Sequence, residues 1–326
     1  CPDGHGNCEG HSKQPSKPGA PASGAPIAES ITPDPNVAPE TPTVEYAAVS
    51  VSSPPVYHSR PTATRRIYLD FNGGVVSGTA WNTSSGVASY DVKVWSQDTD
   101  RTTFNDAEQA WMKKVWQRVA EDYASFDVDV TTDVAYDPDN YTGNKDLVGW
   151  LLICEQTDNN GVALPHSGSG GVAYVNVFGG STYSPNYQPA WVSSTNGGGS
   201  ESIIAEAASH EMGHNMGLNH DANSTQSYYG GHGSGDISWG PIMGTGYNRN
   251  VSQWSKGEYY DANNLQDDLA VIAGKVGYRS DDHGNTPGTA TPLVVAGGTS
   301  ITSTTPENDT NNATTANKGV IERNTD

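Results

Sequence analysis

HEMGHNMGLNHD, residues 210–221 of this 326-residue chain, decides how the rest of the sequence is interpreted. In a helix, His210 and His214 lie one turn apart on the same face, so their imidazoles can bind one metal ion. Glu211 follows His210 and projects about 100° around the helix, toward the open side of that ion. The spacing therefore predicts two metal ligands with a carboxylate beside them.

The same stretch predicts a third ligand. Gly217 can take a positive φ, end the helix and turn the chain back, which brings His220 to the metal. Three neutral imidazoles and one open position are typical of a catalytic zinc site, whereas structural zinc sites are usually closed by four protein ligands, often Cys. No Cys lies near this stretch. The alternative, an exposed helix that carries His by chance, is disfavoured by the number of fixed positions.

This stretch resembles the zinc signature of the metzincin clan of metalloendopeptidases. Asp221, directly after the third His, is most similar to the adamalysin (reprolysin) branch, in a bacterial secreted type. The resemblance implies one Zn²⁺ on His210, His214 and His220, with Glu211 as the general base. It implies that Asp221 orients the turn after the third ligand from outside the metal's own shell, together with Gly217. The implied activity is hydrolysis of internal peptide bonds in protein or peptide substrates.

Metzincins also have a tight turn below the metal that carries a Met. Residues 238–244 read SWGPIMG, and Met243 follows the third His by a plausible distance. The resemblance implies that Met243 forms a hydrophobic floor and does not bind the metal. Some members place a Tyr just beyond this turn to ligate zinc or stabilise the oxyanion. Tyr247 follows Met243 at a longer spacing, so we predict a cleft-wall residue, with the oxyanion role as the alternative.

The residues on either side predict the fold class, α/β (α+β). Strand-like runs lie at 66–71, 126–132, 147–154 and 171–178. Asn105 and Glu108 have capping-box spacing and open an amphipathic helix that closes at 121–123. Residues 180–200 are predicted as a loop, and Ser200 or Ser202 caps the helix that follows.

A final helix is predicted over 263–276, from apolar residues at helical spacing: Leu265, Leu269, Ile272 and Val276. With the resemblance, this order implies a metzincin-like catalytic domain with a twisted mixed five-stranded sheet, an active-site helix, a Met-turn and a C-terminal helix. Residues 171–178 would then be the antiparallel edge strand along the cleft, to which substrate backbone pairs.

Composition divides the chain into three parts. Residues 1–60 are rich in Pro, Ser, Ala and Gly and are predicted as a prosegment or linker. Residues 61–279 are predicted as the zinc metalloprotease catalytic domain. Residues 280–326 are predicted as a linker and a partial C-terminal β-sandwich domain, because the run from 281 resembles the opening of the bacterial pre-peptidase C-terminal domain.

The three cysteines have separate interpretations. Cys1 and Cys8 either close a small disulfide loop or supply a thiolate that occupies the open zinc position, as prosegments do in many metzincins. The second option makes the chain a latent zymogen. Cys154 follows an apolar run and is predicted as a buried, inert thiol.

The net charge of −20 and the pI of about 4.6 argue against nucleic acid and anionic membranes as partners. No run of 18 apolar residues predicts a membrane span. We expect a secreted, extracellular protein. The acidic run Asp98–Asp100 leaves Ca²⁺ open as a second ion without completing a calcium motif, and His232 is predicted as a solvated loop residue. Oligomeric state is unknown at this level, and a zinc-bearing binding module without turnover is the alternative function.

Overall fold

The structure is a computed structural model that describes residues 47–280, 286, 288–290 and 292. The chain divides into the units Cys1–Val44 and Glu45–Asp326, and every described residue lies in the second. The predictions made for Cys1, Cys8 and a C-terminal β-sandwich fall outside the described residues.

The folded domain begins before residue 61, where the composition had suggested a boundary. Strand β1 (Val49–Ser50) pairs antiparallel with β5 (Thr103–Phe104). The Ser59 amide donates to the Val130 carbonyl at 3.0 Å. This part of the N-terminal segment is therefore held to the domain by backbone hydrogen bonds, although its sequence is rich in turn formers.

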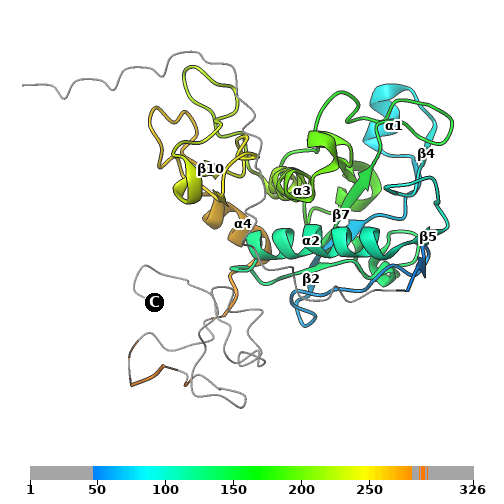
Figure 1. The fold of residues 1–326 in the computed structure, drawn as a ribbon, viewed down its shortest axis with the longest axis horizontal. Helices are drawn as coiled ribbons and strands as arrows, with labels where there is room; N and C mark the ends of the chain where they lie inside the picture. Colours follow the sequence, from blue (N-terminus) through cyan, green and yellow to red (C-terminus); the bar gives the residue numbers. More distant parts are fainter. Residues whose placement is uncertain (1–46, 281–285, 287, 291, 293–326) are drawn as a thin grey trace, which may run out of the picture. The chain divides into compact units, whose positions relative to one another are not determined.

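Five strands form one mixed sheet, in the spatial order β6-β2-β7-β9-β8 (Figure 1). The first four pair in parallel, and β8 at the edge pairs antiparallel with β9. The predicted α/β class with a mixed five-stranded sheet is confirmed. The strands are β2 (Arg65–Asp70), β6 (Val128–Thr131), β7 (Val148–Cys154), β8 (Gly171–Val172) and β9 (Ala190–Ser193).

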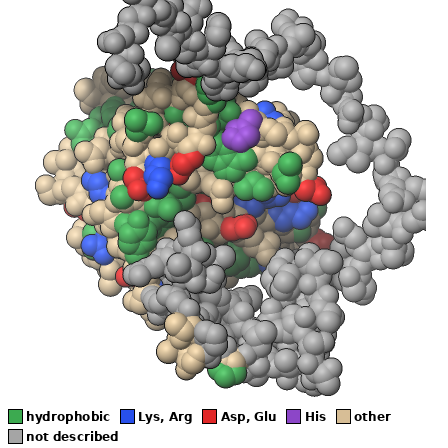
Figure 2. Space-filling view, turned by 90° about the vertical axis from the view of Figure 1, so that its left-hand side faces the viewer, with side chains coloured by type: hydrophobic (Ala, Val, Ile, Leu, Met, Phe, Trp, Pro, Cys, Tyr) green, Lys and Arg blue, Asp and Glu red, His purple; other side chains and the backbone are tan. Residues whose placement is uncertain are grey.

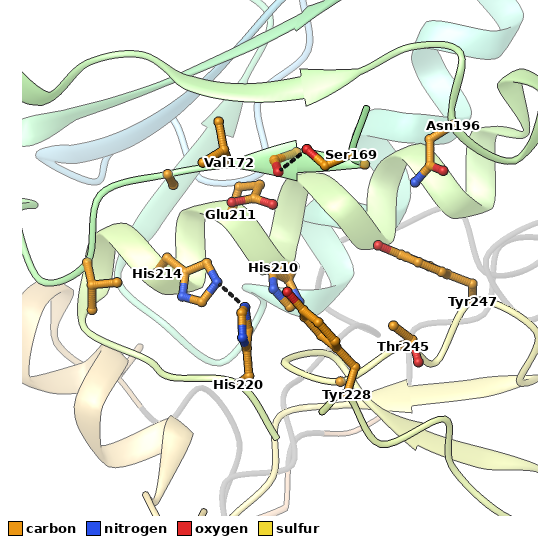
Figure 3. Close-up of a pocket in the computed structure, with 15 residues that line it drawn as sticks. Ser169, Val172, Asn196, His210, Glu211, His214, His220, Tyr228, Thr245 and Tyr247 are labelled. Carbon is orange, nitrogen blue, oxygen red and sulfur yellow. Dashed lines mark hydrogen bonds between the residues drawn. The ribbon is translucent and has the colours of Figure 1, made fainter. Parts of the chain in front are cut away.

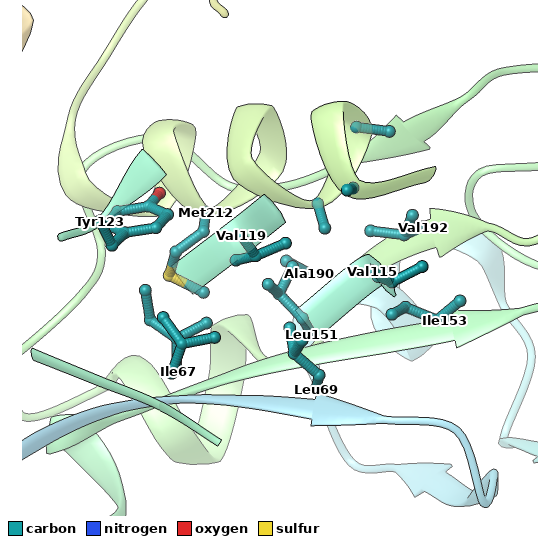
Figure 4. Close-up of a cluster of buried hydrophobic side chains, with 14 of the residues drawn as sticks. Ile67, Leu69, Val115, Val119, Tyr123, Leu151, Ile153, Ala190, Val192 and Met212 are labelled. Carbon is teal, nitrogen blue, oxygen red and sulfur yellow. The ribbon is translucent and has the colours of Figure 1, made fainter. Parts of the chain in front are cut away.

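The central strand β7 separates two hydrophobic clusters. All seven of its residues are buried, and successive side chains point to opposite faces of a sheet. Leu151 and Ile153 join the larger cluster, which lies between the sheet and the two long helices (Figure 4). Leu152 and Cys154 join the smaller cluster on the other face, where Cys154 is a buried free thiol as predicted.

Helices α2 (Asp106–Asp122) and α3 (Glu201–Met216) cover one face of the sheet side by side (Figure 1). The capping box of α2 is present: the Glu108 amide donates to Asn105 Oδ1 at 3.0 Å, and the Asn105 amide donates to Glu108 Oε2 at 2.9 Å. Ser200 is the N-cap of α3, but its hydroxyl bonds the Ser202 hydroxyl instead of a helix amide.

The second face of the sheet is covered by β3 (Gly74–Ser77), α1 (Ala80–Ser85) and β4 (Ser89–Val92), with β3 and β4 paired antiparallel. After α3, the parallel pair of β10 (Trp239–Pro241) and β11 (Val251–Gln253) precedes α4 (Asp268–Val276). In the described part of the chain, no helix is long and apolar enough to cross a membrane. Single helical turns lie at Val134–Tyr136, Lys145–Leu147, Tyr183–Tyr187, Asn196–Gly199 and Gly235–Ile237.

The edge strand is much shorter than the predicted 171–178. Only Gly171 and Val172 pair with β9, and Asn176 has a φ of 62° that extended backbone does not allow. The amides of residues 176–178 instead donate to the carbonyls of His214 and Asn215 at 2.8–2.9 Å. The end of α3 offers unpaired carbonyls, so this segment leaves the sheet to satisfy them.

Strand β9 lies inside the span predicted as a loop, 180–200. It is parallel to β7 and occupies the sheet between β7 and the edge. All four of its residues are buried. The sequence did not predict this strand because it has only four residues, and the polar and Gly-rich residues on both sides of it are typical of turns.

The last helix begins at Asp268, later than the predicted 263. Asp267 is its N-cap, and Asp267 Oδ1 accepts from the Ala270 amide at 3.0 Å. Of the predicted apolar face, Ile272 and Val276 are fully buried, whereas Leu265 is 74% exposed and Leu269 is 40% exposed. The N-cap residue thus sets the start of the helix three residues after the apolar periodicity begins at Leu265.

We predict that Leu151→Ala lowers the free energy of unfolding by about 2–5 kcal/mol, because it removes a fully buried side chain between the sheet and the helices. Leu265→Ala is the matched control, with an expected change within about 0.5 kcal/mol because that side chain is exposed. Urea unfolding of both variants measures the difference. Equal losses would contradict the assignment of β7 as the centre of the core.

His166 is a fully buried base in the structure. Its ring stacks on Trp191 with 5.9 Å between the ring centroids. Burial lowers the pKa of His166 from 6.5 to about 4. Between pH 4 and pH 6.5, His166 binds a proton in the unfolded chain but not in the folded chain. Its contribution to the free energy of unfolding is therefore complete above pH 6.5 and is lost as the pH falls toward 4.

We therefore predict that His166→Phe, which keeps an aromatic ring on Trp191, flattens the acid side of the stability profile. Between pH 7 and pH 4.5 the wild type should lose about 2–3 kcal/mol more than the variant. Denaturant unfolding at the two pH values measures this difference. If both proteins lose the same amount, His166 titrates normally and its burial is not what the structure indicates.

Candidate metal centre

Three histidine side chains meet at the carboxyl end of α3 (Figure 3). One nitrogen from each of His210, His214 and His220 lies within 4.8 Å of the other two. Nε2 of His214 and Nε2 of His220 are 2.9 Å apart. Across residues 47–280 and the few described beyond them, this is the one group of three such side chains close enough to hold a metal ion.

Backbone carbonyls orient the two helical ligands. His210 Nδ1 donates to the Ile242 carbonyl and His214 Nδ1 donates to the Leu218 carbonyl, each at 2.8 Å. Because a carbonyl can only accept, both rings carry their proton on Nδ1 and leave the Nε2 lone pair free. A neutral ring with one free lone pair is the form in which His binds a metal.

Gly217 makes the turn that the sequence predicted. It ends α3 with a φ of 116°, and its amide donates to the His214 carbonyl at 2.9 Å. The Leu218 amide donates to the Gly213 carbonyl at 3.0 Å. This cap reverses the chain and brings His220 back toward the helix.

Burial keeps the histidines neutral. Desolvation lowers the pKa of His210 to about 3 and that of His214 to about 4, and it lowers the pKa of His220 in the same direction. A metal ion therefore does not have to displace a proton from these rings at neutral pH. Taken with the free lone pairs, this donor set fits a zinc ion.

Glu211 lies beside the triad and is 6% exposed. Its Oε2 has no hydrogen-bond partner, and burial raises the pKa of Glu211 to about 8. The carboxyl group borders the cavity under the edge strand (Figure 3). A Cβ added at Gly171 would lie 2.5 Å from Glu211 Oε1, so the absence of a side chain in β8 makes the room that this carboxyl group occupies.

Met243 is fully buried against the helix that carries the histidines. A Cβ at Gly213 would lie 2.7 Å from Met243 Sδ. The Asp221 amide donates to the Met243 carbonyl at 2.8 Å. The Ile242 carbonyl thus holds the ring of His210, the first ligand, and the Met243 carbonyl holds the amide of Asp221, which follows the third ligand.

Asp221 is almost fully buried, and its carboxyl group lies beside the side chains of Ser255, Tyr259 and Asn264. Burial raises its pKa to about 6. The Tyr229 amide donates to the Asp221 carbonyl at 2.7 Å. The hydrogen bonds of Asp221 therefore hold the backbone directly after His220 in place.

Two tyrosines border the cavity from the opposite side to β8 (Figure 3). Tyr247 is predicted from the sequence as a wall residue, and it lines the cavity beside Asn196; burial raises its pKa to about 12. Tyr228 has its ring 4.3 Å from that of His220. Sequence reasoning missed Tyr228, whose signal is an aromatic residue inside the Gly-rich segment before the Met-turn.

The triad, Glu211 and the tyrosines enclose a cavity of about 430 Å³. Its lining has no charged side chain apart from Glu211 and the titratable histidines. The other residues that line it are Ser169, Gly170, Gly171, Val172, Ala173, Val175, Asn196, Tyr228, Gly244, Thr245 and Tyr247.

Other candidate residues lie away from the triad. His232 is exposed, and its Nδ1 is 3.0 Å from the Tyr229 hydroxyl. The oxygens of Asp98 and Asp100 accept from nearby Ser, Asn and Thr groups, and they take part in no close three-ligand group of the described chain.

Residues 85–221 match the family model described as metallo-peptidase family M12B, reprolysin-like. This segment is therefore similar to reprolysin-like metallopeptidase domains. The match ends at Asp221, the last residue of the stretch that supplies the triad. No curated protein matches the chain. The family is a zinc-dependent one, in agreement with the donor set, and a metallopeptidase acts on proteins or peptides.

We predict that Gly171→Ala lowers peptide hydrolysis on the order of 100-fold, because the added Cβ displaces the Glu211 carboxyl group. Zinc content should not change, since no ligand moves. Gly274→Ala in α4 is the control, because its added Cβ meets nothing within 4 Å. A Gly171→Ala protein that keeps full turnover would show that Glu211 does not need this room.

Proposed function

We propose that this protein is a secreted zinc-dependent endopeptidase that hydrolyses internal peptide bonds of proteins. The observation that carries the proposal is the placement of three neutral imidazoles, each able to offer a nitrogen to one point, beside a buried carboxyl group in one cavity. The acidic composition and the resemblance of the motif to secreted metzincins support the location outside the cell.

Zinc bound by His210, His214 and His220 would supply Lewis-acid chemistry, polarising the scissile carbonyl and lowering the pKa of a nearby water. Glu211 would take the proton of that water and pass it to the leaving amine. Burial favours the neutral form of this carboxyl group, and a cation beside it would favour the ionised form that accepts a proton. The unpartnered Oε2 is free for that transfer.

The edge strand supplies a site for the substrate backbone. Among the described strands β8 pairs only with β9, and residues 170–173 line the cavity along its other side. An extended peptide can pair there as an added strand. Pairing of this kind holds the chain on both sides of the reacting bond, which favours internal bonds.

Met243 and Asp221 would hold the metal ligands in place and would not take part in the reaction. Met243 packs below the helix that carries two ligands, and Asp221 fixes the turn after the third. Tyr247 has a pKa raised to about 12, so its hydroxyl stays protonated and can donate a hydrogen bond into the cavity. We assign it to the cavity wall, near a developing negative charge on the substrate carbonyl.

The test is casein hydrolysis by the wild type and by Glu211→Ala, with metal content determined on both. We expect turnover to fall by roughly 10²–10⁴-fold in the variant while about one zinc per chain is retained. His214→Ala should lose both zinc and turnover.

The other outcomes separate the alternatives. If both proteins hold zinc and neither cuts protein, the chain is a zinc-bearing binding module or a latent form, and reaction with a thiol reagent activates only the latent form. If neither protein holds metal, the assignment of the triad is wrong.

A further inference from the structure

A second cavity, of about 760 Å³, lies between α2, the first half of α3 and the chain from 242 to 258. It shares no lining residue with the cavity of the metal centre. The charged side chains that line it are Arg118, Glu121, Asp122, Glu206, Lys256 and Glu258.

Carboxyl groups outnumber cations in this lining. Four acidic residues contribute to it, and the two basic ones, Arg118 and Lys256, are exposed. Neither basic residue forms an ion pair with any described residue within 4.0 Å. Figure 2 shows one face of the molecule, where charged side chains are scattered singly or in small groups among uncharged ones. Of the four carboxyl groups in the cavity, Glu121 and Glu258 are exposed, Asp122 is half-buried and Glu206 is buried.

Glu206 is the buried member of the group, with 8% of its surface exposed. Its Oε1 has no hydrogen-bond partner, while Ser252 hydrogen-bonds the same carboxyl group. Burial raises the pKa of Glu206 to about 7. Arg118, which lines the same cavity, acts on this carboxyl group without forming an ion pair within 4.0 Å. A cation bound in the cavity would supply a closer counter-charge.

The other residues of the cavity indicate whether a metal ion or an organic cation would bind there. Three close ligand atoms for a metal ion occur, within the described chain, only at the histidine triad. Polar groups make up the larger part of the lining, and five apolar side chains contribute the rest: Ala205, Ile242, Val251, Trp254 and Leu269. Such a wall suits the methylene stem of a long side chain whose charged end reaches the carboxyl group.

We propose that this cavity binds a lysine or arginine side chain of the protein substrate, at a distance from the scissile bond, with Glu206 accepting hydrogen bonds from the ammonium or guanidinium group. The proposal rests on the proposed peptidase function for the identity of the ligand. Ile242 joins the two cavities: it lines this one, and its carbonyl accepts from the His210 ring. Glu206 also precedes His210 by one helical turn.

The binding test uses the zinc-loaded full chain and two small probes, Nα-acetyl-arginine amide and its uncharged counterpart Nα-acetyl-norleucine amide. Calorimetric titration should show the arginine probe binding to the wild type and at least tenfold more weakly to Glu206→Gln. The norleucine probe should bind neither protein more tightly than the variant binds arginine. Glu121→Gln, which removes an exposed carboxylate at the rim, is the control and should change the affinity less than twofold.

Equal affinity of the arginine probe for the wild type and Glu206→Gln would overturn the proposal, as would no binding to the wild type. A thermal unfolding midpoint for Glu206→Gln at or above that of the wild type shows that the variant is folded. Because the substitution is isosteric and removes a buried charge, we expect that result.

Hydrolysis gives a second readout. With a long peptide that carries a lysine outside the cleft, Glu206→Gln should raise KM at least fivefold and leave kcat unchanged. The same peptide with norleucine in place of lysine should be cut equally by both proteins. Equal KM values on the lysine peptide would contradict the substrate role. If the wild type cuts no peptide, the proposed peptidase function fails, while the calorimetric result still decides whether the cavity binds a cationic side chain.

Discussion

The hydrogen bond from His210 Nδ1 to the Ile242 carbonyl, 2.8 Å long, is the interaction on which the site depends. It fixes the proton on one nitrogen of the ring and leaves the other free, so it sets both the direction and the chemistry of the ligand. It also joins α3 to a segment more than 30 positions later in the chain. The neighbouring carbonyl, of Met243, holds the amide of Asp221. One short segment thereby fixes both ends of the ligand set.

The helix that carries the ligands is held along its length. Its middle packs against the sheet, where Met212 is fully buried among residues of β2, β7 and α2 (Figure 4). Its carboxyl end is capped by the amides of 176–178, and the Tyr183 hydroxyl donates to Asn215 Oδ1 at 2.7 Å. The metal centre therefore lies on a rigid element. The segment that caps the helix is the direct continuation of β8, so the cleft edge and the ligand helix are positioned by one piece of chain.

Most residues of the site could be predicted from local patterns in the sequence. The spacing of His210 and His214 follows from helix geometry alone, and Gly217 indicated the turn to His220. The capping box of α2 and the apolar run of β7 were equally local, and each is present in the structure. Met243 needed the resemblance to a known family, because a Met near Gly and Pro has no specific meaning by itself.

Features that depend on long-range contacts could not be predicted in the same way. The role of Gly171 becomes visible only once Glu211, 40 positions later, lies beneath it. Tyr228 meets His220 because the loop after the third ligand folds back over it. Residues 173–178 have strand-like alternation, but the free carbonyls at the end of α3 compete for their amides. A pattern of alternation cannot report such competition.

The order of strands in the sheet has a consequence for assembly. Strand β9 follows β8 in the chain, yet it lies between β7 and β8. Strand β8 therefore joins the sheet through β9 alone, a strand that comes later in the chain. It is held there by two residues, whereas β7 is paired along both sides. The rim of the cleft is thus paired through fewer residues than the rest of the sheet, and we expect it to open first. Local opening at this edge leaves the pairing of β6, β2, β7 and β9 with one another intact.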